Sequence, residues 1–526
     1  MKIAIAQLNY TIGDIDGNAS KIIDSINKAK AQRADLVIFA EQAVSGTPAF
    51  DLLRKTTFLE LCEDALVEIA SCCDGIAAIV GLPILTREGT ISAAALIQDR
   101  KVLRYVGKKY ITARREMGFL VPSKGFEYAT IKGHKCAIIV GDDLSREHDF
   151  DQSVETVISI NARKYGKGTM TYRYEMMRHL SFVEAKNLVL VNQVGGATDI
   201  VYDGTSGAFN NRGELVLMMK QFEEDFQIFD TKAQNPPVGI PSTYNDRTRM
   251  VYQAARCGLR DFFVKNGYKK ACIGLSGGID SAVVACLAAD ALGRQNIRAL
   301  LLPSQFSSDH SVEDAKKLAE NLGIEYNVIP ITEIYTSVVN TLKPVIGGRE
   351  FDATEENIQT RIRTVLLMAV QNKADYILLN SSNKSENALG LCTLYGDTAG
   401  AFSPTGDLYK SEMYDLARYI NRTQGDPIPG NILDKEPSSE LHPGQKDSDI
   451  LPPYEVVDAI LYRMIEEGQH REEIVNAGFD SEVVEKIHAM IMRNEKKRYQ
   501  FPPVLRLSMC SFGHERLMPL TNKYGD

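Results

Sequence analysis

The chain has 526 residues, a formal net charge of −8 and a hydrophobic content of 44%, which suit a globular protein of two or more domains. The acidic balance provides no overall basic surface for a nucleic acid, and no apolar run is long enough to cross a membrane. The nine cysteines have no metal-type spacing, and the first residues lack the apolar core of a signal peptide. We therefore expect reduced thiols and a cytoplasmic protein.

The first part of the chain, residues 1–233, alternates short apolar runs with segments of helical periodicity. The predicted strands are 2–8, 35–40, 76–82, 92–98, 102–105, 136–140, 188–192, 207–210 and 215–219, and the predicted helices are 18–34 and 58–72. This alternation predicts an α/β fold in which mixed sheets are stacked and flanked by helices.

The residues at the ends of these strands resemble nitrilase-type amidases, in particular the glutaminase domain of glutamine-dependent NAD synthetases. The matching stretches are AIAQLNYTIGD, DLVIFAEQAVSG, VLRYVGKKYI, CAIIVGDDLS and VLVNQVGGATDIVYDGTSGAFNNRGEL. The resemblance implies an α–β–β–α sandwich and a Glu–Lys–Cys catalytic set. Glu41 matches the proton-accepting glutamate and Lys108 the lysine for the oxyanion, although Lys109 leaves that register open by one residue.

The nucleophile position of this set departs from the family pattern, because Gly141 stands where the family has cysteine. Glycine has no side chain, so no thioester can form there. Cys136 lies an odd number of residues earlier on the same predicted strand, which turns it to the opposite face, and we interpret it as a core residue. The stretch 111–117 also departs from the family, and two degraded motifs favour natural loss of glutaminase chemistry over a single introduced change. Glu41 and Lys108 are then a buried ion pair or remnants.

A proline-rich polar segment, 234–245, is predicted as a linker to a second domain over 246–526. Beyond the linker, predicted helices at 246–266, 281–292, 311–322 and 354–372 alternate with strands at 297–302, 326–329 and 375–379. This order predicts a doubly wound parallel sheet, whose ligands bind beyond the carboxyl ends of the strands.

The stretch IGLSGGIDSA at 273–282 lies between an apolar run and a predicted helix. Its glycines allow backbone N–H groups to converge on a phosphate, and the helix start adds free N–H groups. Asp280 would repel a phosphate, which implies a divalent cation between them. The stretch lacks the Walker pattern and resembles the SGGxDS pyrophosphate loop of ATP pyrophosphatases. A glycine-rich turn without a ligand is the alternative.

Three more motifs lie where such a site needs polar groups: NSSNKSE at 380–386, LCTLYGD at 391–397 followed by PTGDLYK at 404–410, and ENIQTRIR at 356–363. Each has an ordinary interpretation when taken alone, as a helix cap, a solvated lysine or a packed helix. Asn357 and Arg361 share one helical face. Together with EPSSELHPGQKD at 436–447 and KKRYQFPP at 496–503, these motifs strongly resemble NAD synthetase.

The resemblance assigns roles by matched position in an adenine nucleotide alpha hydrolase-like domain. ATP would be bound by Gly274, Leu275, Ser276, Gly277, Gly278, Ile279, Asp280, Ser281, Ser381 and Lys410. Mg²⁺ would be held by Asp280 and Glu386. Deamido-NAD would be bound by Asn357, Arg361, Glu386, Leu391, Cys392, Thr393, Leu394 and Lys497.

The activity that the resemblance implies is adenylation of deamido-NAD by ATP, followed by amidation to NAD. It also implies a homo-oligomer, dimeric through the synthetase domain or larger. Because Gly141 removes the glutaminase nucleophile, we expect free ammonia as the nitrogen donor. The alternatives are ammonia from a non-standard or partner glutaminase, a different carboxylate substrate, an active amidase with a passenger synthetase domain, and a non-catalytic nucleotide sensor.

Overall fold

The computed structural model describes residues 1–146, 149–244, 246–522 and 524. The chain divides into compact units, Met1–Asn245 and Asp246–Asp526. Residues 234–244 of the predicted linker are mostly exposed. Asn245, the last residue of that linker, and Asp526, the end of the second predicted domain, lie outside the described residues.

The first unit contains two mixed sheets within the described part of the chain, in the orders β14-β1-β2-β3-β4-β5 and β13-β12-β9-β8-β7-β6. The central strands β1–β3 and β7–β9 run parallel, and the outer strands pair antiparallel. The strands of the first sheet are β1 (Lys2–Gln7), β2 (Leu36–Ile38), β3 (Ala77–Leu85), β4 (Thr90–Gln98), β5 (Lys101–Gly107) and β14 (Asp225–Asp230). Those of the second are β6 (Glu127–Ile131), β7 (His134–Val140), β8 (Thr156–Asn161), β9 (Asn187–Asn192), β12 (Gly207–Phe209) and β13 (Leu215–Met218).

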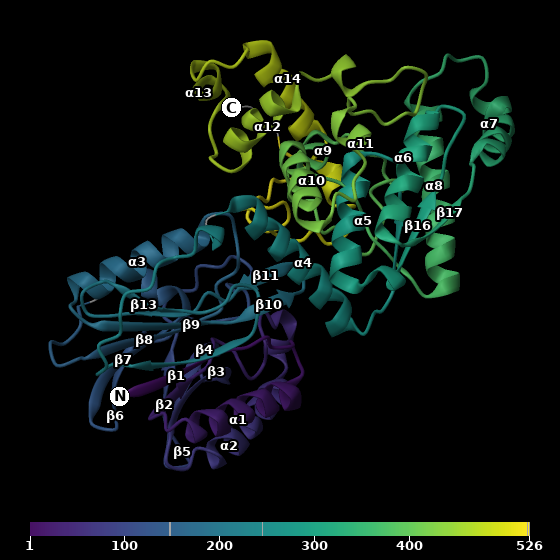
Figure 1. The fold of residues 1–526 in the computed structure, drawn as a ribbon. Helices are drawn as coiled ribbons and strands as arrows, with labels where there is room; N and C mark the ends of the chain where they lie inside the picture. Colours follow the sequence, from purple (N-terminus) through teal and green to yellow (C-terminus); the bar gives the residue numbers. More distant parts are fainter. Residues whose placement is uncertain (147–148, 245, 523, 525–526) are drawn as a thin grey trace. The chain divides into compact units, whose positions relative to one another are not determined.

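Helices α1 (Ile15–Ala31) and α2 (Thr56–Ser71) cover the outer face of the first sheet, and α3 (Thr169–Val183) covers that of the second (Figure 1). The α1 residues Ile22 and Ile26 are fully buried against the first sheet. A separate core, which includes Ile38 and Ile138, fills the space between the sheets. Because each helix buries only one face, the result is the predicted α–β–β–α sandwich.

A short hairpin, β10 (Val194–Ala197) and β11 (Ile200–Asp203), contains the adjacent glycines Gly195 and Gly196. Gly195 has φ +105, and a Cβ on it would lie 2.2 Å from Oδ1 of Asn9. Glycine is therefore required there for both conformation and close approach.

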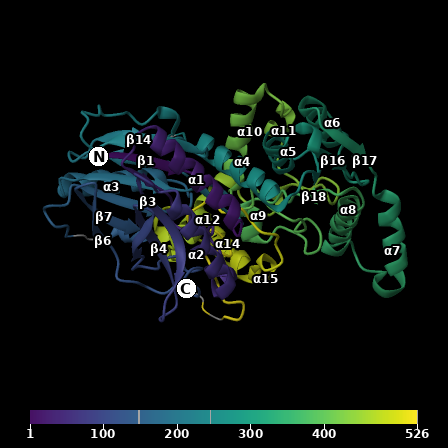
Figure 2. The same cartoon turned by 90° about the horizontal axis from the view of Figure 1, so that it is seen from below.

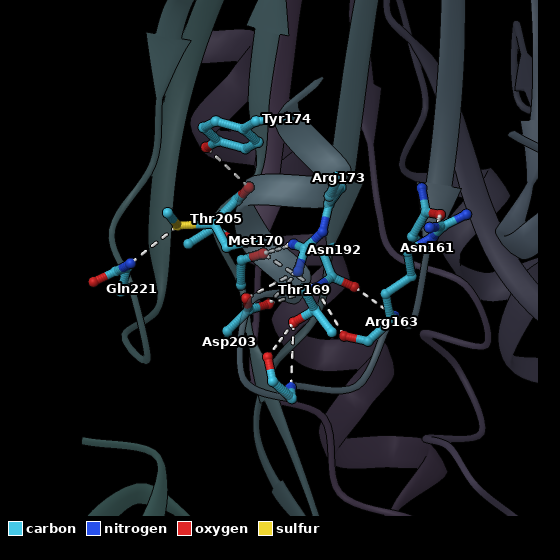
Figure 3. Close-up of polar contacts among 12 residues, drawn as sticks. Asn161, Arg163, Thr169, Met170, Arg173, Tyr174, Asn192, Asp203, Thr205 and Gln221 are labelled. Carbon is cyan, nitrogen blue, oxygen red and sulfur yellow. Dashed lines mark hydrogen bonds and ion pairs between the residues drawn. The ribbon is translucent and has the colours of Figure 1, made fainter. Parts of the chain in front are cut away.

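A buried ion pair ties α3 to the end of β11 (Figure 3). Arg173 is 2% exposed and Asp203 fully buried. Nη2 of Arg173 donates to both carboxylate oxygens of Asp203 at 2.9 Å, and its Nη1 donates to Oγ1 of Thr205 at 2.8 Å. Asn192 on β9 donates to the same carboxylate at 3.2 Å. The charge on Asp203 is thus compensated within the fold, as a buried carboxylate requires.

We predict that Arg173→Ala lowers the free energy of unfolding by about 3–5 kcal/mol, because it leaves Asp203 buried without its cation. Chemical denaturation of the full chain, followed by a signal from the first unit, measures the change. Arg178→Ala removes an exposed pair on the same helix and should change stability by less than about 0.5 kcal/mol. Equal effects of the two variants would contradict the prediction.

The second unit is built on a parallel sheet in the order β17-β16-β15-β18. Its strands are β15 (Ala271–Gly274), β16 (Ile297–Leu301), β17 (Glu325–Val328) and β18 (Ile377–Leu378). The strand predicted at 375–379 is shorter than expected, because Asp375 has φ +56 and ends the preceding helix.

Helices α5, α6 and α8 pack against these strands, and α7 lies beside α8 (Figure 2). The helices up to the carboxyl edge are α4 (Arg247–Asn266), α5 (Ile279–Leu292), α6 (Asp309–Leu322), α7 (Thr332–Ile346), α8 (Ala353–Ala374) and α9 (Lys384–Leu389). Those that follow are α10 (Lys410–Gln424), α11 (Gly430–Asp434), α12 (Tyr454–Ile465), α13 (Arg471–Asn476), α14 (Ser481–Arg493) and α15 (Glu495–Arg498). Helices α12 and α14 pack on α9 and form a core that includes Leu389, Ile460 and Ile487. In the described residues, every helix is too short or too polar to span a bilayer.

Candidate functional site

The glycine-rich loop runs from the end of β15 at Gly274 to the start of α5 at Ile279. Gly277 has φ +82, and a Cβ on it would lie 2.2 Å from the carbonyl oxygen of Ser311, so other residues do not fit there. The hydroxyls of Ser276 and Ser281 lie 3.1 Å apart. The first N–H groups of α5 lie at this end of the loop, where an anion binds favourably.

A cavity of about 610 Å³ opens at the carboxyl ends of β15 and β16, beside this loop and α8. Its size and its mixture of apolar and polar walls are typical of small-molecule sites. The predicted residues that line it are Gly274, Leu275, Ser276, Gly278, Ile279, Asp280, Ser281, Ser381, Glu386, Cys392 and Lys410. The structure thus brings together most of the predicted ATP site.

Lys410 lies between two carboxylates of the cavity. Its Nζ is 2.5 Å from Oδ2 of Asp280 and 3.4 Å from Oε1 of Glu386. Burial opposes the charge of Lys410, but Asp280 and Glu386 outweigh it and raise the pKa of the ammonium. Burial, and then the charge of Asp280, raise the pKa of Glu386 to about 8. The carboxylates therefore have affinity for more positive charge than Lys410 supplies.

Buried polar contacts hold these three groups in place. Asn383 caps α9 by accepting from the N–H of Glu386 at 2.9 Å, and its Nδ2 donates to Oδ1 of Asp280 at 3.0 Å. The helix-cap interpretation of this motif is thus correct, and the cap also contacts the site. Asp458 on α12 accepts from the hydroxyl of Ser385 at 2.5 Å, and that hydroxyl accepts from the N–H of Lys410 at 2.9 Å.

The remaining residues predicted for the dinucleotide lie outside the lining of this cavity: Asn357, Arg361, Leu391, Thr393, Leu394 and Lys497. Gly277, which was predicted for the ATP site, is buried and is not part of the cavity lining. Arg361 is exposed, and its Nε donates to the carbonyl of Leu394 at 3.2 Å. Nζ of Lys497 donates to the carbonyls of Gly390 and Cys392. In this structure, Arg361 and Lys497 therefore support the 390–394 loop. The contact of the six residues with deamido-NAD stays a prediction.

Arg363 and Asp397 both line the cavity, but no role was assigned to either of them from the sequence, although both lie in motifs expected at the site. The face of α8 toward the cavity carries Thr360, Arg363, Thr364 and Leu367, at the spacing of one helical stripe. This stripe differs from the one that contains Asn357 and Arg361. The polar stripe of two threonines and one arginine is the sequence signal that could have identified the face of α8 toward the cavity.

A second buried charge cluster lies in the first unit. Nζ of Lys108 is 3.2 Å from Oε1 of Glu41, and both side chains are almost fully buried. The neighbouring Lys109 instead uses its N–H to contact Asp143, so Lys108 is the lysine beside Glu41. Gly141 directly follows β7, and a Cβ on it would lie 2.6 Å from Oε2 of Glu41 and 3.0 Å from Nζ of Lys108. The three matched positions therefore meet in space.

Other charged groups surround this cluster and were also missed. Lys108 lies 3.2 Å from Glu116 and 3.7 Å from Asp142, and Nη2 of Arg163 lies 3.9 Å from Asp142. Burial raises the pKa of Glu116. Burial would also raise the pKa of Asp142, but the charge of Lys108 outweighs it and lowers that pKa. Asn161 and Asn192 accept from the Nε and N–H of Arg163 (Figure 3).

Three buried thiols of the first unit are not suited to act as nucleophiles. Cys136 is fully buried in the core between the sheets, as predicted. Burial raises the pKa of Cys62, Cys73 and Cys136 to about 12. Such thiols stay protonated at neutral pH, whereas catalysis requires a thiolate.

The second unit offers oxygen ligands for a divalent cation. In the described residues there is no group of three or more His, Cys, Asp and Glu side chains arranged for a metal. Asp280 and Glu386 nevertheless offer hard oxygen ligands beside the glycine loop, and Mg²⁺ commonly combines one or two carboxylates with substrate phosphates. The raised pKa of Glu386 agrees with a site that gains a cation together with its substrate.

Comparison with known proteins agrees with this geometry. Residues 251–501 match the family model of NAD synthase. The glutamine-dependent NAD(+) synthetase of Acinetobacter baylyi is 37% identical over 99% of this chain and 98% of its own length. That of Aquifex aeolicus is 36% identical over the whole of both chains. The solved structure of glutamine-dependent NAD+ synthetase from Acinetobacter baumannii in complex with ADP is 33% identical, covers 99% of this chain and 98% of its own, and has a TM-score of 0.76.

The parallel sheet, the cavity beside its glycine loop and the family match define an ATP-dependent ligase of the NAD synthase class. The full-length similarity extends this assignment to the nitrilase-like first unit. The chain belongs to the glutamine-dependent NAD(+) synthetase family.

The buried carboxylate of Asp397 allows a prediction about pH. Burial raises its pKa from 3.8 to about 6. As the pH rises, the unfolded chain therefore releases the proton of Asp397 at a lower pH than the folded chain does. The contribution of the protonated carboxyl to the free energy of unfolding is fully present below about pH 4 and is lost as the pH rises through about 6. Asp397→Asn should therefore gain stability relative to the wild type over this range, by up to about 3 kcal/mol.

Thermal unfolding of the full chain at about pH 5 and about pH 7.5 measures this difference. The exposed carboxylate change Asp415→Asn is the matched control, whose melting temperature should stay close to that of the wild type at both values. A difference between Asp397→Asn and wild type that is independent of pH would exclude the titration of Asp397 as its cause.

Proposed function

We propose that this chain forms NAD from deamido-NAD, ATP and free ammonia, and that its nitrilase-like unit has no glutaminase activity. The observation that carries the proposal is the position of Gly141 beside Glu41 and Lys108. The proton acceptor and the oxyanion lysine are both present, but the atom that would attack glutamine is absent.

The first chemical step is adenylation. An oxygen of the nicotinate carboxylate attacks the α-phosphorus of ATP, and pyrophosphate leaves. Charge that develops on the leaving group is stabilised by positioned N–H donors and cations. The amides at the start of α5, the hydroxyls of Ser276 and Ser281, and Lys410 are suited to this role. Mg²⁺ held by Asp280 and Glu386 would neutralise the phosphate charge further.

The second step is amidation. Ammonia attacks the acyl carbon of the adenylate, AMP leaves, and a proton is released to give the amide of NAD. The adenylate must be shielded from water during this step. The segment 435–447 forms part of the cavity wall and is suited to limit the access of water. Glu440 accepts from the hydroxyls of Ser308 and Ser311 at 2.7 and 2.8 Å, which fixes this segment at the start of α6.

The nitrogen donor follows from the first unit. Glutamine hydrolysis requires an attacking thiolate, and the thiols of Cys62, Cys73 and Cys136 have a pKa of about 12. Ammonia delivered by a separate glutaminase is the alternative source, and a different carboxylate substrate is the alternative for the ligase. The homo-oligomer and the cytoplasmic location stay predictions.

We predict NAD formation from ATP and deamido-NAD with ammonium, and no formation with glutamine above the level without a donor. Purified full-length protein is assayed with each donor, and both NAD and AMP are quantified by chromatography. Lys410→Met should reduce the ammonium-dependent rate by about 100-fold or more, since it removes a cation that contacts the reacting phosphates. This variant also controls for a contaminating enzyme. Glutamine-dependent turnover that Lys410→Met abolishes would refute the proposal.

We further predict that Gly141→Cys alone does not produce glutamine-dependent NAD formation. Residue 141 has φ +59, and a Cβ there would displace Glu41 and Lys108 from their present contact. Lys108 is also held by Glu116 and Asp142, so the pair has little freedom to reorganise. Glutaminase assay and thermal unfolding of the variant test this, with Gly141→Ala as the matched control. Efficient glutamine hydrolysis by Gly141→Cys would show that the lost thiol is the sole defect.

A further inference from the structure

The cavity beside the glycine loop contains one cation without an ion-pair partner. In the described part of the chain, the lysines and arginines that line it are Arg363, Lys410, Lys435 and Lys446. Lys410 pairs with Asp280, Lys435 lies 3.7 Å from Asp314, and Lys446 lies 2.7 Å from Glu436. Among the described residues, no carboxylate oxygen lies within 4.0 Å of the guanidinium of Arg363.

Arg363 is nevertheless held firmly in the wall. Its Nε donates to the carbonyl of Leu302, one residue beyond β16, at 2.9 Å. One residue further along α8, the hydroxyl of Thr364 donates to the carbonyl of Gly396 at 2.7 Å. Leu367, one turn on, lies so near the end of β15 that a Cβ on Gly274 would be 3.3 Å from its Cδ1. These contacts fix α8 against the carboxyl edge of the sheet, so the guanidinium lies at the edge where ligands bind.

The terminal nitrogens of this guanidinium have no hydrogen-bond acceptor among the described residues. The nearby carboxylates accept hydrogen bonds from other groups. Asp397 accepts from the N–H of Thr393, and Glu440 accepts from the hydroxyls of Ser308 and Ser311. Burial lowers the pKa of Arg363 to about 10, against the opposing charges of Asp397 and Glu440. Arg363 is half-buried, and a guanidinium at such a position that has no acidic partner is free to pair with an incoming anion.

A guanidinium fork matches the geometry of phosphate and carboxylate oxygens, and such pairs form two parallel hydrogen bonds. Resting on the proposed function, we propose that Arg363 binds an oxyanion of one substrate, either a phosphate of ATP or an anionic group of the dinucleotide. Lys410 and Arg363 then hold different anionic groups, since Lys410 lies with Asp280 at the glycine loop whereas Arg363 lies with Leu302 beyond β16.

Calorimetric titration of the full chain with ATP and, separately, with deamido-NAD tests this proposal. Arg363→Met should weaken binding of one of the two ligands by about 10- to 100-fold, the loss expected for a charged pair of hydrogen bonds, and leave the other within about two-fold. Loss of ATP affinity assigns the phosphate of ATP, and loss of deamido-NAD affinity assigns the dinucleotide. Arg363→Lys should lose most of the same affinity, because an ammonium keeps the charge but not the fork.

Arg298→Met is the matched control, because Arg298 lies on β16 with an ion pair to Glu325 and does not line the cavity. It should leave both affinities within about two-fold, and thermal unfolding should show Arg363→Met folded. Unchanged affinity for both ligands in Arg363→Met, or equal loss of both with a lowered melting temperature, would overturn the proposal. The ammonium assay of the wild type judges the proposed function separately, since these binding constants do not depend on turnover.

Discussion

The second unit depends on the position of one buried ammonium, that of Lys410, between Asp280 and Glu386. Three parts of the chain meet at this point: the first turn of α5, helix α9 and the start of α10. Asn383 and Asp458 hold the same parts in place through hydrogen bonds. Because each partner is far from the others in sequence, this charge cluster has the geometry of a site only in the folded unit. Its carboxylates are under-compensated, which suits a site that receives phosphates together with a cation.

The first unit contains a comparable buried charge cluster. Lys108 is held among Glu41, Glu116 and Asp142, and Gly141 occupies the point where these groups converge. A sandwich with complete cores on both faces of its sheets remains stable whether or not the site works, because packing and not chemistry holds it together. This separation is consistent with the proposal that the nitrilase-like fold persists without glutaminase activity.

Much of the fold, and which residues gather around the glycine loop, could be predicted from the sequence, because the signals are local. The glycine loop, the strand before it and the helix after it are contiguous, and strand periodicity predicted the sandwich. The orientation of α8 could not be predicted, since Ile358 and Ile362 define a core face but not which neighbouring stripe faces the cavity. Arg363 was missed for that reason. Glu116 and Arg163 were missed because they reach Lys108 and Asp142 only through tertiary contacts.

Isotopic competition tests the central claim most directly. The protein is given ATP and deamido-NAD with equal concentrations of heavy-nitrogen ammonium and unlabelled glutamine, and the amide nitrogen of the product is identified by mass spectrometry. The account predicts NAD whose amide carries the heavy isotope throughout, because only free ammonia reaches the adenylate. An unlabelled amide would contradict it, since that nitrogen could come only from glutamine.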